Sequence, residues 1–157
     1  SMSVTTSIHQ FLHEAQVPYT VVPHRPAFSA QHDAAAVHVP GRDWAKVVVC
    51  VIDGKPVEAV VSATRSVNLA DLVDLAGGDL IRLATEDELV NLFPDCERGA
   101  MPPLGPVYGQ QVFVDVELAG EQDIVFDGGN HTEAISMRWA DYAKAVKPVV
   151  GRFAATM

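Results

Sequence analysis

The stretch that decides the fold is AKVVVCVI, residues 45–52, followed by Asp53-Gly54 and then by PVEAVV, residues 56–61. Two runs rich in β-branched residues, joined by an Asp-Gly pair, predict a β-hairpin. The first run is apolar almost throughout, so we expect it to be buried on both faces. Lys46, near the start of that run, is the exception to this burial.

Helices are predicted before and after the hairpin. Apolar residues recur at helical spacing between Ile8 and Ala15, so residues 3–16 are predicted to form an amphipathic helix that ends before Pro18. Ser1, ahead of the first methionine, is interpreted as a remnant of expression. Further helices are predicted over residues 29–37, 69–76, 85–92 and 139–146.

Short strands are predicted at residues 19–22 and 80–84, and three more at 111–118, 123–126 and 131–137. The last three are expected to form a meander, with a tight connection at Asp127-Gly128-Gly129-Asn130. No repeat, linker or low-complexity tract interrupts the chain. We therefore expect one domain over residues 2–157, with a mixed α/β fold in which a mostly antiparallel sheet is surrounded by helices.

Length and composition fit one globular domain. The chain has 157 residues, of which 48% are hydrophobic and 20% charged, far from the composition of disordered chains. No apolar run reaches the roughly 18 to 20 residues that cross a bilayer, and the first residues lack the order of a signal peptide, so we expect a cytoplasmic protein with no membrane partner. Cys50 and Cys96 have no partner at metal or redox spacing and are expected to be free thiols.

The acidic balance limits the kinds of partner. A formal net charge of −9 argues against a general nucleic-acid binder, because such proteins gain affinity by neutralising phosphates with lysine and arginine. We therefore expect no DNA partner. A few local cations could still hold one nucleic-acid terminus, and the candidates are Arg25, Arg42, Lys46 and Arg65.

One candidate for chemistry is Lys46 at the start of its apolar run. It is either a solvated strand end or a cation at the mouth of a pocket, where it would bind a phosphate or a polarised carbonyl as a point charge. A second candidate is the loop Gly99-Ala100-Met101-Pro102-Pro103. Glycine lets a backbone approach a ligand closely and proline stiffens the loop, although a plain surface turn has the same composition.

A third candidate is the segment Gly128-Gly129-Asn130-His131-Thr132. A neutral imidazole has both a donor and an acceptor, so His131 could orient a water, contact a substrate or line a pocket. Packing at a strand edge explains it equally well.

In their order and spacing these features resemble the YbaK/prolyl-tRNA synthetase-associated family along nearly the whole chain. That family has a lysine at the start of a central strand, a glycine-x-x-x-proline loop after a helix, and a polar or histidine-bearing segment before the final strand and helix. Lys46, Gly99 to Pro103 and His131 stand at these positions, with the histidine as the looser match.

The resemblance implies a deacylase that hydrolyses the ester bond of mischarged aminoacyl-tRNA in trans, for tRNA(Pro) or a similar tRNA carrying a small amino acid. Lys46 would hold the terminal phosphate or the aminoacyl carbonyl, and the loop would position the ribose and ester for attack by water, with no metal or cofactor. The implied partners are the aminoacyl-tRNA 3′ end and an aminoacyl-tRNA synthetase as a docking partner. Besides the catalytic candidates Lys46, Gly99 and His131, the substrate-binding candidates are Met101, Pro102, Pro103, Gly129, Asn130, Thr132 and Ser136, with Val47 and Met137 as further apolar ones.

Metal binding is weighed as an alternative. His9 and His13 are four residues apart on the first predicted helix, a spacing that can bind metal, but no third ligand is apparent and a solvated helix face fits better. His24, His32 and His38 show no ligand spacing either, so no metal site is predicted.

Two other functions stay open. A Cys96–His131 pair could make a hydrolase for another small ester, although the neighbouring Asp95 and Glu97 disfavour the thiolate. Alternatively, the chain could bind tRNA or a nucleotide with little catalysis.

Overall fold

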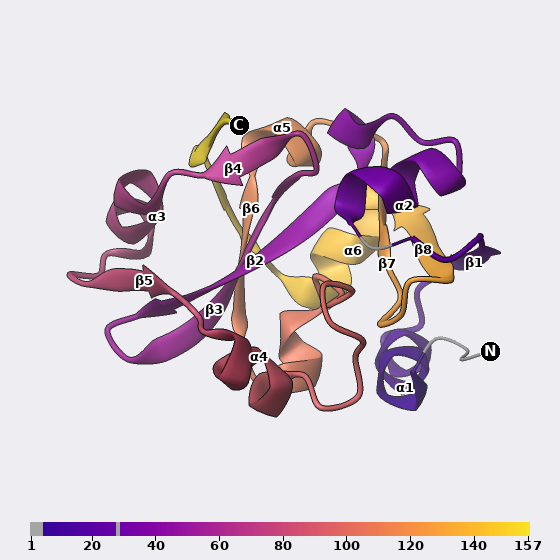
Figure 1. Cartoon of the computed structure of the whole chain (residues 1–157), viewed down its shortest axis with the longest axis horizontal. Helices are drawn as coiled ribbons and strands as arrows, with labels where there is room; N and C mark the ends of the chain where they lie inside the picture. The colour runs from indigo at the N-terminus through magenta and orange to yellow at the C-terminus, as the bar shows by residue number, and fades with distance from the viewer. Residues whose placement is uncertain (1–4, 28) are drawn as a thin grey trace.

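The computed structural model describes residues 5–27 and 29–157 (Figure 1). Ser1, interpreted as an expression remnant, and the first two residues of the helix predicted from residue 3 lie outside the described residues. Figure 1 shows the hairpin strand β2 crossing the middle of the molecule, with α3 beside one end and α2 and α6 towards the other.

The predicted hairpin is confirmed. Strands β2 (Ala45–Ile52) and β3 (Lys55–Ser62) pair antiparallel from Ala45 opposite Ser62 to Ile52 opposite Lys55. Asp53 and Gly54 both have positive φ, 50° and 83°, as a tight turn with the right-handed twist of a hairpin requires.

A five-stranded sheet surrounds this hairpin in the order β5-β2-β3-β6-β9. The added strands are β5 (Ile81–Leu83), β6 (Gln111–Asp115) and β9 (Val149–Gly151). Strands β3, β6 and β9 run parallel, whereas β2 is antiparallel to both of its neighbours. Successive residues of β6 pack on opposite sides, with Val112 and Val114 in one hydrophobic cluster and Phe113 in another, so the sheet is buried on both faces.

Two smaller antiparallel sheets complete the fold. One has the order β1-β8-β7, formed by Thr20–Pro23, Glu133–Arg138 and Asp123–Asp127, and the other pairs β4 (Arg65–Val67) with β10 (Ala154–Thr156). The mixed, mostly antiparallel α/β fold is confirmed, with its strands in three sheets.

The expected meander over residues 111–137 is wrong in its first strand. Strand β6 ends at Asp115 and pairs with β3 and β9, not with β7. The Asp115 carboxylate accepts hydrogen bonds from the backbone N–H of Glu117 at 3.0 Å and of Phe153 at 2.9 Å. The first of these bonds caps the short helix α5 (Val116–Ala119), which turns the chain out of the sheet where the strand was predicted to continue.

The long helices lie where they were predicted. They are α1 (Thr6–Glu14), α2 (Ala30–Ala36), α3 (Leu69–Ala76), α4 (Glu86–Leu92) and α6 (Trp139–Val146), with single 3-10 turns at Gly41–Asp43 and Gly105–Tyr108. Local signals set their ends: Thr85 and Glu88 form a capping box at α4, and Gly77 ends α3 with φ 70°. In the described part of the chain no helix has the length and apolar character needed to cross a membrane.

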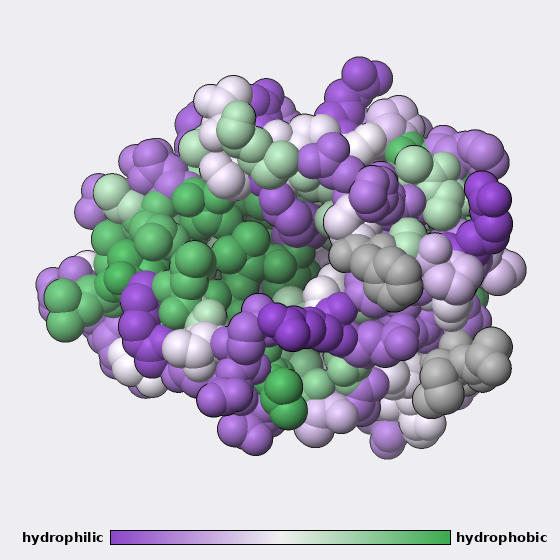
Figure 2. Space-filling model, in the orientation of Figure 1, coloured by the Kyte–Doolittle hydropathy of each residue, from purple (hydrophilic) through white to green (hydrophobic). Residues whose placement is uncertain are grey.

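One face of the molecule carries a broad apolar surface, at the end that holds α3 and β5 (Figure 2). Leu80 and Leu83 are exposed by 75% and 55% on this side. The opposite end, where α2 covers β7 and β8, is more polar in the same view and contains the residues discussed next.

Candidate functional site

Two of the three candidate features lie against each other. The loop that contains Gly99 and the segment 128–132 are joined by backbone hydrogen bonds from Glu97 N to Gly129 O at 2.8 Å and from Gly129 N to Ala100 O at 3.1 Å. The backbone N–H of His131 also donates to the Glu97 carboxylate at 2.7 Å. These long-range bonds fix the glycine loop beside the histidine.

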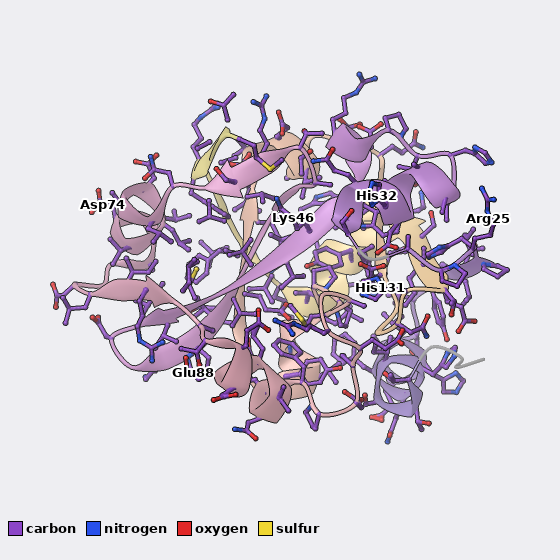
Figure 3. The ribbon with its side chains drawn as sticks, viewed as in Figure 1. Arg25, His32, Lys46, Asp74, Glu88 and His131 are labelled. Atoms are coloured by element: carbon purple, nitrogen blue, oxygen red, sulfur yellow. The ribbon has the colours of Figure 1, made fainter. Side chains whose placement is uncertain are left out.

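His131 is held at both ring nitrogens. Its Nδ1 lies 3.1 Å from Oδ2 of Asp33, and its Nε2 lies 2.6 Å from the carbonyl oxygen of Arg98. Because a carbonyl oxygen can only accept, Nε2 carries the hydrogen in that bond. Asp33 is fully buried on α2 and His131 is only 5% exposed, so the ring has a fixed orientation beneath α2 (Figure 3).

Gly99 fits closely over this ring. Its φ is +79°, which an L side chain rarely adopts, and a Cβ placed there would lie 3.6 Å from Nε2 of His131. Glycine at this position therefore meets the need of the backbone conformation, while an added Cβ would make an ordinary contact with the imidazole.

The other candidates in the two segments are tied to the framework. Pro102 and Pro103 are buried, and the carbonyl oxygen of Pro103 accepts a 2.6 Å hydrogen bond from the hydroxyl of Tyr142. The Oδ1 atom of Asn130 accepts from both the backbone N–H and the hydroxyl of Thr132, each at 2.9 Å. These bonds hold the backbone in place around Gly99 and His131.

Lys46 lies in a different setting. It lines a hollow of about 350 Å³ together with the first residues of α2, Ala63 and Met157. Its Nζ donates to the backbone carbonyl of Arg65 and lies 3.5 Å from the sulfur of Met157. Partial burial lowers the pKa of Lys46 from its ordinary value.

Helix α2 connects the two settings. His32 lines the hollow of Lys46, whereas the next residue, Asp33, contacts His131. Lys46 itself contacts Arg65 and Met157. The structure thus brings the loop and the histidine together and places the lysine in a hollow beside the first residues of α2.

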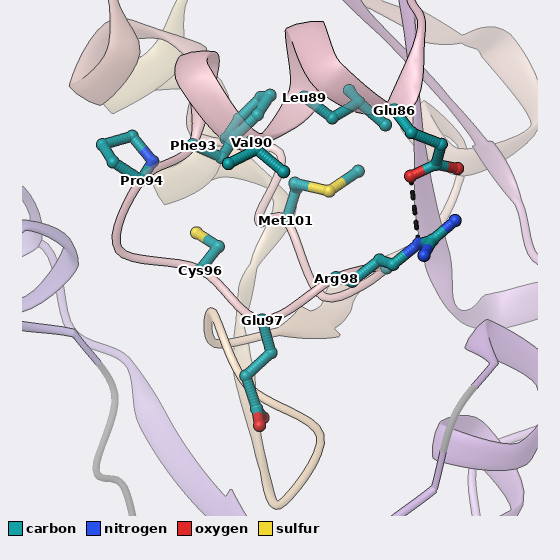
Figure 4. A pocket seen from close by; sticks show the side chains of 10 residues that line it. Glu86, Leu89, Val90, Phe93, Pro94, Cys96, Glu97, Arg98 and Met101 are labelled. Carbon is teal, nitrogen blue, oxygen red and sulfur yellow. Dashed lines mark ion pairs between the residues drawn. The ribbon is translucent and has the colours of Figure 1, made fainter.

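A small pocket of about 100 Å³ opens on the other side of the glycine loop (Figure 4). Leu89 of α4 and Phe93, which follows the helix, line it together with Gly99 and Met101 of the loop. Arg98 and Glu86 form an ion pair at 3.0 Å beside it. Met101 was the apolar pocket candidate that the structure places here.

The remaining candidates lie elsewhere. Met137 is part of the hydrophobic core, and Val47 is half-buried in β2. Ser136 lies within β8, opposite Thr20 of β1 and Val125 of β7.

Cys96 lines the same small pocket, but its surroundings do not favour a nucleophile. Its sulfur lies 3.1 Å from the hydroxyl of Tyr108, next to Asp95. Burial, together with the negative charge of Asp95, raises the pKa of the Cys96 thiol to about 12. Since His131 is bonded through its two ring nitrogens to Asp33 and Arg98, the contacts do not support a Cys96–His131 pair.

Sequence reasoning missed three acids: Asp33 and Glu97, which bind His131, and Glu58, which is buried in the central strand β3. Glu58 is fully buried, and burial raises the pKa of its carboxyl well above the ordinary value. A carboxyl group inside the apolar run PVEAVV and a single acid inside the alanine-rich α2 were the signals that could have found two of them.

Comparison with known proteins identifies the family of the chain. Residues 24–145 match the aminoacyl-tRNA editing domain family, a range that includes Lys46, the glycine loop and His131. The chain belongs to this family. The resemblance noted from the sequence is thereby confirmed.

Two curated relatives are proline–tRNA ligases of Nitratidesulfovibrio vulgaris. The ligase of strain Hildenborough is 33% identical over 100 residues, and that of strain DP4 is 32% identical over 100 residues. The match covers 64% of this editing domain chain but only 17% of each ligase. The chain therefore corresponds to a small part of those enzymes.

Solved structures share the fold. A crystal structure of a hypothetical protein superposes with a TM-score of 0.84 at 18% identity, covering 94% of this chain and 99% of the other. A candidate trans-editing enzyme for prolyl tRNA synthetase gives a TM-score of 0.80 at 21% identity, covering 96% and 98%. At these identities the likeness establishes the architecture.

Proposed function

We propose that this editing domain hydrolyses the ester between a small amino acid and the 3′-terminal adenosine of a mischarged tRNA, with tRNA(Pro) as the first candidate. The observation that carries the proposal is the Gly99–Pro103 loop, which is hydrogen-bonded to the segment 128–132 and packed on His131, within the residues that match the editing family. The partner on this proposal is the aminoacyl-tRNA 3′ end.

Lys46 is the proposed anchor for the terminal phosphate or the aminoacyl carbonyl. Within residues 5–27 and 29–157 it forms no ion pair; its Nζ donates to the carbonyl oxygen of Arg65. A ligand oxygen could replace that neutral acceptor without separating an existing charge pair. Partial burial makes the Coulomb attraction stronger than it would be in bulk water.

The loop is proposed to position the ribose and the ester. A water oxygen attacks the ester carbonyl carbon, the bond from that carbon to the ribose oxygen breaks, and the ribose oxygen takes a proton, so that the free amino acid and a tRNA with an intact terminal ribose leave. Backbone dipoles fixed in a stiff loop can stabilise the oxyanion formed on the way. The bonds that hold Ala100, Pro103 and His131 supply the necessary rigidity.

The small pocket beside the loop is the proposed site for the amino-acid side chain. Its volume of about 100 Å³ and its lining by Leu89, Phe93 and Met101 suit a small apolar group. An editing site is useful for such substrates, because one methylene gives a synthetase only about 1 to 3 kcal/mol of discrimination. A larger side chain would not fit without moving Met101.

The test is deacylation of a panel of tRNAs mischarged with alanine, cysteine, serine or proline. Wild type and Lys46→Ala are compared at low and moderate salt. Lysine-dependent release of one amino acid would support the proposal and identify the substrate. Binding of tRNA without release from any member of the panel, with a known deacylase active in parallel, would instead indicate a binding module.

A further inference from the structure

Three potential metal ligands meet at α2, and one of them, Asp33, is also the partner of His131 described above. His24 follows β1, Asp33 lies in α2 and Asp127 ends β7, and each offers one ligand atom within 4.8 Å of the other two. Asp33 is fully buried and Asp127 is 5% exposed. Segments far apart in the chain thus place one nitrogen and two carboxylate oxygens together.

These atoms have no hydrogen-bond partner among the described residues. The unpaired atoms are Oδ1 of Asp33, Oδ1 of Asp127 and Nε2 of His24, all buried. A buried polar atom without a partner costs roughly 1 to 3 kcal/mol, and more when it is charged. The two buried carboxylates therefore need either a shared proton or a cation between them.

The histidine distinguishes these two solutions. Nδ1 of His24 lies 2.8 Å from the carbonyl oxygen of Arg25. A carbonyl only accepts, so Nδ1 carries the hydrogen and the buried Nε2 presents a lone pair. Histidines that bind metals are commonly oriented in this way, by a hydrogen bond from the other ring nitrogen. A proton shared by two carboxylates would not require such a nitrogen beside them.

We infer that His24, Asp33 and Asp127 form a binding site for a divalent transition-metal ion, for which Zn²⁺ is the appropriate probe. An imidazole nitrogen favours such ions over Mg²⁺ and Ca²⁺, which prefer oxygen ligands alone. The ion would neutralise both carboxylates and tie α2 to the end of β7 and to the segment after β1. Asp33 would bind it through Oδ1 while Oδ2 still contacts His131.

The experiment measures Zn²⁺ binding to chelator-treated protein by competition with a chromophoric chelator. All variants carry His13→Ala, which removes the exposed histidine four residues from His9 and hence a background site on α1. We expect one Zn²⁺ per chain and a loss of affinity of more than about 100-fold in Asp127→Asn. This loss exceeds the 10- to 100-fold typical when only a hydrogen-bond partner of a metal ligand is removed. The matched control is Asp123→Asn, since Asp123 is an exposed acid on the same strand. This variant should bind Zn²⁺ as tightly as the parent protein, which carries His13→Ala alone.

A second measurement protects the conclusion against misfolding. The thermal midpoint should rise with Zn²⁺ in the parent and the control but not in Asp127→Asn or His24→Gln, since a ligand stabilises only the state that binds it. The inference fails if the His13→Ala parent binds no more Zn²⁺ than Asp127→Asn does. It also fails if Asp127→Asn has a higher thermal midpoint than the metal-free parent and Zn²⁺ changes the midpoint of neither protein. A proton shared by the carboxylates would then explain the cluster. Neither readout uses tRNA, so the result does not depend on deacylation.

Discussion

Lys46 and His131 are both candidate functional residues, yet the protein surrounds them in opposite ways. Lys46 borders a hollow of about 350 Å³, and its contacts are a backbone carbonyl and a thioether. His131 is bonded through its backbone N–H and both ring nitrogens. The comparison indicates that Lys46 can exchange its partners for a ligand, whereas His131 first holds the site together.

The largest effect that this contrast predicts is on activity at Lys46. Lys46→Ala should lower kcat/KM for deacylation by about 100- to 1,000-fold, the range seen when one donor to a developing charge is removed. The free energy of unfolding should change little, because no buried partner is left with an unpaired charge. Single-turnover deacylation and urea denaturation measure the two quantities.

Lys55→Ala is the matched control, since Lys55 is exposed on the other strand of the same hairpin. Its activity should stay near that of wild type. A wild-type rate in Lys46→Ala would remove the lysine from the mechanism, and an equal loss in Lys55→Ala would point to general charge instead of a specific contact.

The next effect is on stability at His131. His131→Ala should lower the free energy of unfolding by about 3 kcal/mol, because it leaves the buried Asp33 carboxylate without this partner. Urea denaturation in the presence of a chelator measures the loss without a contribution from metal. His32→Ala, an exposed change at the neighbouring position of α2, should stay within about 0.5 kcal/mol. Equal costs for the two variants would mean that the His131 contacts contribute little.

The contrast also marks what the sequence could predict. The hairpin and the long helices were predictable because their signals are local, such as the Asp53-Gly54 turn and the Thr85 and Glu88 capping box. The place of β6 and the short strands β9 and β10 were not predictable, because their pairing, parallel for β6 and β9 and antiparallel for β10, depends on partners far along the chain.

The candidate site also contains features that the sequence could predict and features that it could not. The glycine loop and the histidine could be named from residue types and order, but their hydrogen bonds to each other could not. Asp33 was missed because nothing beside it in the sequence indicates that it reaches residue 131. The position of Lys46 in a hollow beside the first residues of α2 is likewise a product of tertiary packing.

A substitution at Gly99 tests the loop packed on His131, with a smaller expected effect on stability. Gly99→Ala should cost about 1 kcal/mol of stability, because its φ of +79° is strained for alanine. The matched control is Gly77→Ala, at φ +70° with no atom within 4 Å of an added Cβ. The two stability costs should be similar, since the 3.6 Å contact with His131 is an ordinary one.

Only deacylation should separate these two variants. We expect Gly99→Ala to lose activity several-fold, because displacement of the loop moves the groups that position the ester, while Gly77→Ala keeps it. If the two variants were equally active, the loop would be a structural turn and the functional role of Gly99 would be lost.

The smallest effect is expected at Cys96, which lines the small pocket beside the glycine loop. It has neither the role of Lys46 nor that of His131. With a thiol pKa of about 12, only about one molecule in 10⁴ carries the thiolate at pH 8, against roughly a quarter for an ordinary cysteine. The reactive fraction rises tenfold per pH unit until the pH reaches the pKa. Alkylation of the folded protein by iodoacetamide should therefore be slow at pH 8 and accelerate steeply with pH, whereas the urea-unfolded chain should react at the ordinary rate.

Cys96→Ser should keep deacylation within about twofold, because serine retains a polar atom facing the hydroxyl of Tyr108 and the proposed chemistry uses water as the nucleophile. Rapid alkylation at pH 7 that abolished turnover would contradict both statements. It would show that the pocket activates a thiol, which the burial of Cys96 and the negative charge of Asp95 both oppose. The Cys96 thiolate would then be the nucleophile in place of water. The mechanism would need this third group in addition to Lys46, which exchanges its contacts for a ligand, and His131, which is held in place.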